Sequence, residues 1–268
     1  MKVILVIASA LALVGLPVRG QAADDPVASA PGHTLYGDPA VPDISGLWLG
    51  TYTLRPGDTP QTPVAPQDTT RWAPWPPPLT PAYRKQADVL DAAAKQGRAI
   101  GDNGARCLPF GVTQMLTIGV YPFEIVQTPG QVSVWPFSQM PIVIWTDGRS
   151  HPKELKDSYN GHTIGYWEGD TLHADTVGML PSIPISPNAR TPHSNKLHIQ
   201  WTLRRVAADV VHMQITLFDD DAFTEPMVTT ELLRRKAGPN WQEFDDISCF
   251  ENNRNQVDSE GAPGFTTF

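Results

Sequence analysis

Apolar and polar residues alternate along two neighbouring segments in the last third of the chain. In residues 195–206 every second position from Leu197 to Leu203 is apolar, and residues 210–218 repeat this pattern. A period of two places all of the apolar side chains on one face of an extended strand. The two segments are joined by the short turn 207–209, so they predict a long β-hairpin with one buried face.

Shorter runs of β-prone residues occur before and after this hairpin, separated by turn residues such as Pro129-Gly130 and Gly169-Asp170. Besides the long pair, the pattern predicts strands near 114–120, 122–128, 131–137, 141–146, 163–168, 171–177 and 226–235. Mostly antiparallel strands in hairpin order predict an all-β fold. We expect a lipocalin-like up-and-down antiparallel barrel or a strongly curved sheet, which can enclose one modest ligand. A two-sheet sandwich is the alternative.

One helix is predicted, directly before these strands. Residues 82–96 are rich in alanine, leucine, lysine and glutamine, and they are flanked by Thr80-Pro81 and Gly97. A threonine cap with proline in the first turn starts a helix well, and glycine commonly ends one. We expect this helix to lead into a barrel domain that covers residues 82–268.

The segment before the helix predicts an extended arm. Residues 24–81 hold almost half of the 27 prolines, and proline cannot donate a hydrogen bond to a sheet. One short strand near 44–53 is expected within this arm because its leucine and tyrosine residues form an apolar side. Trp72 and Trp75 are interpreted as anchors of the arm, with ligand stacking as the alternative.

The N-terminus has the pattern of a secretory signal peptide. Lys2 precedes an apolar run over residues 3–16, and small residues follow at 20–23. This run is too short to span a bilayer and is flanked in the manner of a secretory signal. We expect residues 1–23 to be removed and the mature protein to be periplasmic or secreted, without a membrane span.

Charge and cysteine content narrow the possible partners. Removal of the signal peptide, which has two basic residues and no acidic one, takes the formal net charge from −8 to −10. Such an acidic chain repels phosphate backbones, so a small-molecule ligand is expected in place of nucleic acid. Cys107 and Cys249 form an even pair in an oxidising compartment and predict a disulfide that ties the C-terminal tail to the barrel domain. A metal-binding or catalytic cysteine is the minority alternative.

Most of the candidate chemistry lies around the hairpin 163–177. Under a two-residue turn at Gly169-Asp170, the loops 147–162 and 178–194 emerge at the same end of the sheet. The residues expected at this barrel mouth are Asp147, Arg149, His151, His162 and His193, with Asp175 close by. Binding sites in barrels tend to lie at such mouths, on loops that a rigid scaffold holds.

Histidine, aspartate and arginine together suit proton transfer near neutral pH. A neutral histidine oriented by a carboxylate removes a proton, and an arginine stabilises the oxyanion that develops. The expected catalytic residues are His151, His162, His193, Asp147 and Asp175, and the expected substrate-binding residues are Arg149, Tyr166, Trp167 and Ser194. No cofactor is expected; zinc or copper held by His151, His162 and His193 is the minority alternative.

Each candidate also has a purely structural interpretation. Asp147 suits a turn with Gly148, and Trp167 suits the core of the sheet. In the strand 171–177, His173 and Asp175 share one face, which is either a polar interior wall or the solvent side. Under the two-residue turn they lie opposite Tyr166 and Ile164, respectively. The remaining histidines, His33, His198 and His212, are expected to be structural or exposed.

The motifs resemble those of a family of uncharacterised secreted bacterial proteins. The matching segments are EIVQTPGQV, DGRSHP, GHTIGYWEGDTLHADTVG, PHSNKLHI and FTEPM, and the likeness covers roughly residues 40–252. The resemblance implies a shared secreted β fold. Members of the family usually have an apolar residue where this chain has His173, so the resemblance weakens a catalytic role for that histidine.

Three hypotheses follow for the function. The first is a secreted enzyme, a lyase, isomerase or hydrolase, that performs cofactor-independent acid–base chemistry on a small aromatic or apolar molecule in the barrel cavity. The second is a lipocalin-like binding protein without catalysis, and the third is an assembly protein that uses the proline-rich arm as a strap. No P-loop, dinucleotide fingerprint, G-x-S-x-G elbow or H-E-x-x-H motif is present, which excludes the chemistries that these motifs indicate.

Overall fold

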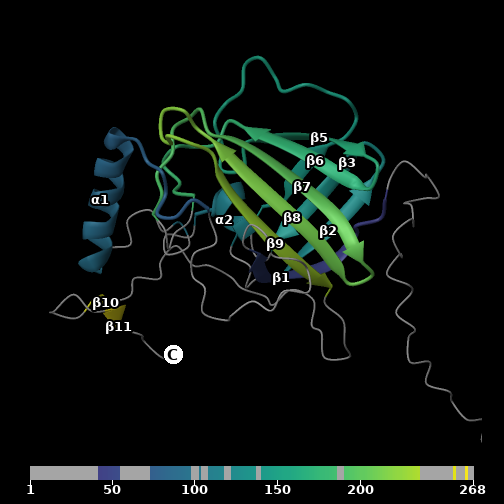
Figure 1. The fold of residues 1–268 in the computed structure, drawn as a ribbon, viewed down its shortest axis with the longest axis horizontal. Coiled ribbons are helices and arrows are strands. Elements are labelled where there is room, and N and C mark those ends of the chain that lie inside the picture. Colours follow the sequence, from purple (N-terminus) through teal and green to yellow (C-terminus); the bar gives the residue numbers. More distant parts are fainter. Residues whose placement is uncertain are drawn as a thin grey trace, which may run out of the picture.

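The computed structural model describes residues 42–54, 73–97, 103, 108–117, 122–136, 140–185, 190–235, 256–257 and 263–264. Within these ranges, nine consecutive strands form a closed barrel, shown in Figure 1. The barrel strands are β1 (Gly46–Leu54), β2 (Pro122–Thr128), β3 (Gln131–Pro136), β4 (Ile142–Trp145), β5 (His162–Glu168), β6 (Thr171–Val177), β7 (His198–Ala207), β8 (Val210–Phe218) and β9 (Met227–Arg235). The prediction of an all-β barrel is confirmed.

The barrel is mixed, because one of its strand pairs is parallel. β4 and β5 run in the same direction, with Ile144 opposite Thr163, while the other neighbouring pairs in the barrel are antiparallel. Parallel neighbours need a crossover connection in place of a hairpin loop. Residues 146–161 make this crossover, and Figure 1 shows it arching over the outside of the barrel above β5. The purely up-and-down order that we predicted is therefore wrong at this one connection.

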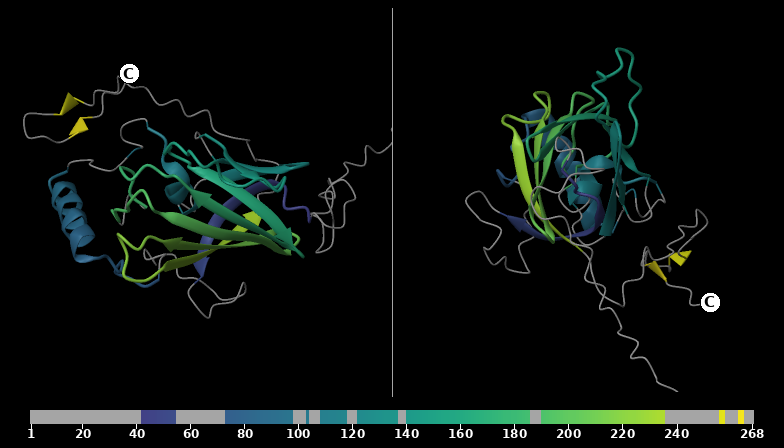
Figure 2. Two further views of the ribbon diagram at one scale, coloured as in Figure 1. Left: turned by 90° about the horizontal axis from the view of Figure 1, so that it is seen from above. Right: turned by 90° about the vertical axis from the view of Figure 1, so that its right-hand side faces the viewer.

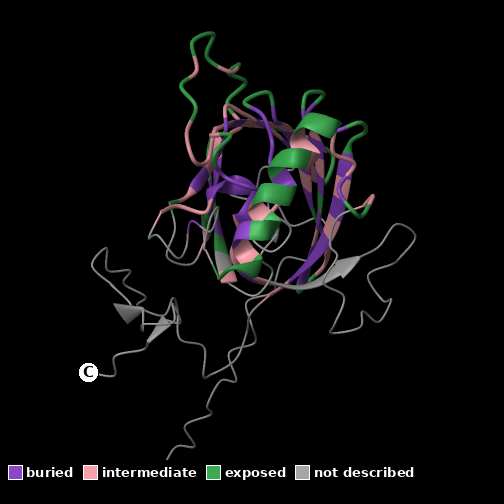
Figure 3. Cartoon of the chain, turned by 90° about the vertical axis from the view of Figure 1, so that its left-hand side faces the viewer, coloured by how far each residue is buried: buried purple, intermediate pink, exposed green. Residues whose placement is uncertain are grey.

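Alternation along the strands fills the barrel interior. In β7 and β8 the buried positions are those predicted from the period of two, and they include Trp201 and Met213. They join one continuous apolar cluster that extends to Trp48 of β1. Figure 3 shows buried residues, in purple, along the strands that form the barrel. These packed side chains make the barrel interior a hydrophobic core. Each large apolar side chain buried there stabilises the fold by roughly 1.5–3 kcal/mol.

A short helix, α2 (Gly111–Thr117), occupies the segment where we predicted a strand near 114–120. The end-on view in Figure 2 places α2 within the ring of strands. Val112 and Leu116 belong to the core cluster, and the Gln114 side chain donates a hydrogen bond to the carbonyl of Pro184. Burial on several sides leaves little periodicity in the sequence, and tertiary packing overrides the β preference of valine and threonine.

The predicted helix before the strands is confirmed as α1 (Pro81–Lys95), with Pro81 in its first turn. Gly97 follows the helix end with a φ of +72°, a conformation that favours glycine. The Thr80 hydroxyl does not cap the helix and donates instead to the carbonyl of Asp221. Figure 3 shows most of α1 exposed, and its buried residues are Ala87 and Ala93.

The proline-rich arm contributes a strand to the barrel wall. β1, which corresponds to the strand predicted near 44–53, pairs with both β9 and β2 and so closes the barrel. The later part of the arm runs along the start of β9 and the loop before it, with bridges from Ala73 to Val228 and from Leu79 to Phe223. Trp75 is 44% exposed, which does not fit a buried anchor.

Several predictions fall on residues outside the described ranges. These are the signal peptide 1–23, Trp72, and the predicted disulfide between Cys107 and Cys249. A separate two-stranded pair, β10 (Gln256–Val257) and β11 (Pro263–Gly264), lies in the C-terminal part of the chain. Among the helices of the described residues, none has the length and apolar character needed to cross a bilayer.

Candidate functional site

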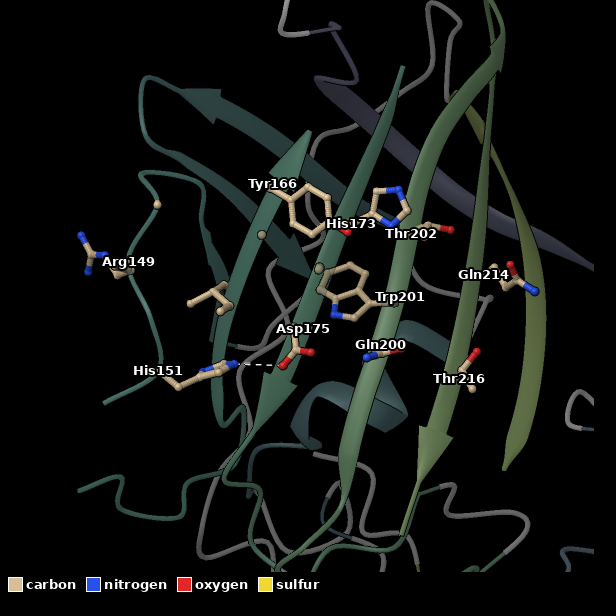
Figure 4. A pocket seen from close by; sticks show the side chains of 14 residues that line it. Arg149, His151, Tyr166, His173, Asp175, Gln200, Trp201, Thr202, Gln214 and Thr216 are labelled. Carbon is tan, nitrogen blue, oxygen red and sulfur yellow. Dashed lines mark hydrogen bonds and ion pairs between the residues drawn. The ribbon is translucent and has the colours of Figure 1, made fainter. Parts of the chain in front are cut away.

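A groove of about 590 Å³ lies on the outer wall of the barrel. Its floor consists of two rows of cross-strand neighbours that run from β5 to β8, as the strand pairing defines them. The first row is Ile164, Asp175, Gln200 and Thr216, and the second row is Tyr166, His173, Thr202 and Gln214. Figure 4 shows the labelled members of both rows, with Arg149 and His151 on one side. The crossover 146–161 therefore forms a wall of the groove.

The location of this groove corrects the expected barrel mouth. In β6 the buried positions are Leu172, Ala174 and Thr176, and these point into the core. His173 and Asp175 alternate with them and therefore face outward. Because the crossover returns over the outside of the barrel, its histidine meets the outer face of β6. The candidate residues were expected around an opening of the barrel, and the structure places this groove on the outer wall.

Four side chains form a continuous hydrogen-bonded chain at one end of the groove. His162 Nδ1 lies 2.8 Å from His151 Nδ1, and His151 Nε2 lies 2.9 Å from Asp175 Oδ1. The other carboxylate oxygen, Asp175 Oδ2, lies 2.6 Å from His198 Nε2. We name this His162–His151–Asp175–His198 arrangement the relay. The dashed line in Figure 4 marks its central contact.

The relay fixes the tautomers of its neutral imidazoles. An ionised aspartate only accepts hydrogen bonds, so the Nε2 atoms of His151 and His198 each donate to Asp175. In a neutral His151 the Nδ1 atom is then the acceptor, and His162 Nδ1–H donates to it. The remaining nitrogen of His162, Nε2, has a free lone pair and no hydrogen-bond partner among the described residues.

The His162 ring is neutral at pH 7. Burial lowers its pKa from the ordinary value of 6.5, and the electrostatic interactions with His151 and Arg149 lower it further. Gly161, immediately before it, has a φ of +63°, which favours glycine, and brings the chain close to β6. His162 is not one of the groove-lining residues, and it contacts the groove through His151.

Asp147 and Arg149 lie together but outside the relay. The Arg149 guanidinium donates to the Asp147 carboxylate, with Nε 2.9 Å from Oδ1, and this pairing lowers the pKa of Asp147. Arg149 also covers the Trp145 ring, with its Cζ 3.7 Å from the ring centroid. Asp147 thus orients an arginine in the structure, and the carboxylate that orients a histidine is Asp175.

His193 and Ser194 belong to a different part of the molecule. His193 is 3% exposed, and its Nδ1 contacts the carbonyl of Ser194, while burial lowers its pKa. The Ser194 hydroxyl and backbone N–H both donate to Asp219, a carboxylate that also accepts from the backbone of Ala222. This arrangement organises a buried loop, and neither residue lines the groove. The expected gathering of His193 with His151 and His162 is not found.

The two expected aromatic contacts separate onto the two faces of β5. Tyr166 is 60% exposed in the groove, and its ring is stacked on His173 with centroids 5.0 Å apart. Trp167, on the opposite face, packs against the core, as its structural interpretation anticipated. The predicted register of this hairpin is confirmed, since Tyr166 pairs with His173 and Ile164 pairs with Asp175.

His198 was not among the predicted site residues, because it was expected to be structural or exposed. Its side chain is 35% exposed and bonds to Asp175 on the neighbouring strand. The sequence signal that could have found it is the alternation of faces along β7. His198 and Gln200 share the outer face of this strand, and Gln200 lies opposite Asp175. A histidine two residues from the cross-strand partner of an aspartate is within reach of a diagonal contact.

The described residues contain no cluster of three or more histidine, cysteine, aspartate or glutamate side chains arranged to hold a metal ion. The zinc or copper alternative required His193 beside the other two histidines, and His193 lies elsewhere. No protein-family model matches the sequence, and no curated protein matches it.

Proposed function

We propose that the protein is an exported enzyme that performs acid–base chemistry on a small molecule held in the outer-wall groove. The observation that supports this proposal is the unbroken relay from His162 through His151 and Asp175 to His198. Lyase, isomerase and hydrolase reactions all need such a group to take up a proton and return it. The N-terminal signal pattern supports export to the periplasm or beyond.

In this proposal His162 Nε2 is the general base. It has a free lone pair, and its lowered pKa keeps it neutral at pH 7. His151 and Asp175 line the groove and His162 is joined to it through His151, so we propose that solvent water carries the substrate proton to His162. As His162 becomes an imidazolium, its Nδ1–H bond to His151 strengthens, because charged donors make stronger hydrogen bonds.

Asp175 and His198 complete the proposed machinery as positioning residues. Asp175 holds His151 in the tautomer that accepts from His162, and its negative charge stabilises the positive charge that develops on the histidines. His198 donates to the second oxygen of the same carboxylate and fixes its orientation. The directions of these hydrogen bonds support this division of roles.

The test is proton exchange in deuterated water. The purified protein is incubated with a panel of esters, lactones and β-hydroxy carbonyl compounds, and mass spectrometry follows both turnover and deuterium uptake. For any compound that reacts, Asp175→Asn and His162→Gln are expected to lower the rate by about 10²–10⁴-fold, the usual contribution of general acid–base catalysis. The matched control is His212→Gln, which changes another outward-facing histidine of the same wall that does not line the groove.

Two results would contradict this proposal. If Asp175→Asn and His162→Gln react as fast as the wild type, the relay plays no part in the chemistry. If molecules bind in the groove but none is converted or exchanged, the protein is a binding protein. That second function is favoured by the exposed Tyr166 ring, but it differs from a lipocalin-like protein because the barrel interior is a packed core.

A further inference from the structure

The charged side chains that line the groove already have partners in the protein. Asp175 is bonded to two histidines, and Arg149 is bonded to Asp147. His173 lies 3.3 Å from a carboxylate oxygen of Glu168. A charged ligand would have to compete with one of these pairs and lose its own hydration, which is unfavourable without a free opposite charge. The lining therefore favours a ligand without net charge.

The part of the floor on β7 and β8 is a neutral hydrogen-bonding surface. Gln200 lies directly opposite Thr216, and Thr202 lies directly opposite Gln214, so amides and hydroxyls alternate across β7 and β8. The polar groups of these four side chains have no hydrogen-bond partner among the described residues. Each glutamine offers both donors and an acceptor, and each threonine offers one donor and acceptor oxygen. A molecule lying on this floor can exchange hydrogen bonds of both kinds.

An apolar ligand fits the β7 and β8 part of this floor poorly. It would cover the amides and hydroxyls, remove their water and offer nothing in return, and an unsatisfied polar group is costly. A ligand with several hydroxyl groups replaces the lost water at each position. At the β5 end of the groove, the exposed Tyr166 ring offers a flat apolar surface beside His173. The ligand therefore needs a hydroxyl-rich edge together with an apolar face.

We infer that the groove binds a neutral polyhydroxylated molecule, such as a mono- or disaccharide, across the amide and hydroxyl side chains of β7 and β8. The volume of about 590 Å³ lies in the range of sites for small ligands. This inference rests on the groove of the proposed function and replaces the aromatic or apolar substrate expected from the sequence.

The experiment measures binding by calorimetry and by saturation-transfer NMR. The probes are glucose, N-acetylglucosamine, cellobiose and maltose at millimolar concentration, with naphthol as the apolar comparison. At least one saccharide is expected to bind the wild type. Gln214→Ala and Thr216→Val are each expected to weaken that binding roughly three- to tenfold, the effect of one neutral hydrogen bond.

Thr230→Ala is the matched control, because Thr230 lies opposite Gln214 on β9 and does not line the groove. Its saccharide affinity is expected to equal that of the wild type. The inference is overturned if none of the four saccharides binds, if both groove variants bind as the wild type does, or if naphthol binds and Gln214→Ala tightens its binding. Circular dichroism of each variant establishes that the barrel is folded.

Failure of this inference and failure of the proposed function give different results. Asp175→Asn is expected to retain most of the saccharide affinity, because β7 and β8 supply most of the hydrogen bonds, and to lose proton exchange. Saccharide binding without turnover in the wild type refutes the enzyme proposal alone. Turnover of an apolar compound without saccharide binding refutes the ligand inference alone.

Discussion

The Nδ1 atoms of His151 and His162 lie 2.8 Å apart, so one ring must donate a hydrogen bond that the other accepts. The direction is set on the far side of His151, where Nε2 donates to Asp175. Hydrogen bonds thereby connect the crossover, through His151, both to His162 at the start of β5 and to Asp175 of β6. This contact connects the chemistry of the groove to the unusual strand order of the barrel.

The first prediction concerns tautomers. His162 is expected to be protonated on Nδ1, while His151 and His198 are expected to be protonated on Nε2, because Asp175 accepts from both of them. Nitrogen-15 NMR of the imidazoles at pH 8 distinguishes the two neutral forms directly. Asp175→Asn should mix the tautomers of His151. A His162 protonated on Nε2 in the wild type would contradict the direction of the relay.

The second prediction concerns the contact by which Asp175 of β6 binds the crossover 146–161 to the barrel wall. An asparagine at position 175 keeps one acceptor oxygen, but its NH₂ group faces a donor where the second oxygen stood. Asp175→Asn is therefore expected to lower the free energy of unfolding by about 1–2 kcal/mol. Hydrogen exchange of the backbone in 146–161 is expected to accelerate.

Asp170→Asn is the control for this measurement. Asp170 lies at the β5–β6 turn and forms an exposed pair with Arg204. Such pairs contribute little, so its effect is expected to stay within about 0.5 kcal/mol. Equal effects of the two substitutions in urea unfolding would show that Asp175 does not hold the crossover.

Local patterns were sufficient to predict most of the barrel. The period of two in β7 and β8 identified the buried face, and the Gly169-Asp170 turn fixed the register that places Tyr166 opposite His173. Each of these features is encoded in a short continuous stretch of the sequence. The same register, extended one strand further, would have brought His198 near Asp175, but the pairing of β6 with β7 crosses a long loop and has no local signal.

The crossover and α2 could not be predicted in this way. Nothing within 146–161 distinguishes a hairpin loop from a return across the outer wall, because its direction depends on how β4 finds its neighbour. The single change from antiparallel to parallel moves His151 from an opening of the barrel to its outside. His193 is a related case: its place in the loop 178–194 predicted a position at the barrel mouth, and the structure buries its ring in a loop.

The third prediction concerns the glycine before His162. Gly161 has a φ of +63°, and a Cβ at this position would overlap the carbonyl of Val177 and the sulfur of Met179. Gly161→Ala is expected to cost about 3 kcal/mol or more, since strain and overlap add, and to displace His162 from the relay. Gly148 has a similar φ of +82° with no atom near the added Cβ. Gly148→Ala should therefore cost only about 1 kcal/mol, and equal losses in thermal unfolding would contradict this account.

The fourth prediction concerns stability in acid. Burial lowers the pKa of His193 below the ordinary 6.5, so the folded protein resists protonation that the unfolded chain accepts. The contribution of the neutral ring to the free energy of unfolding is then fully present above about pH 6.5. It decreases as the pH falls towards the lowered pKa, by up to about 1.4 kcal/mol per pH unit. The neighbouring Asp219 opposes this shift without reversing it, because burial is the larger cause.

Urea unfolding at several pH values tests this prediction. His193→Gln is expected to flatten the loss of stability between pH 6.5 and pH 5, and His193→Asn serves as a second variant if glutamine is not accommodated. His212→Gln is the comparison, because burial also lowers the pKa of His212, but that ring is only partly buried on the outer wall. His193→Gln should remove the larger share of the slope. A slope that is unchanged in both His193 variants, or that increases, would show that the buried ring is protonated as easily in the folded protein as in the unfolded chain.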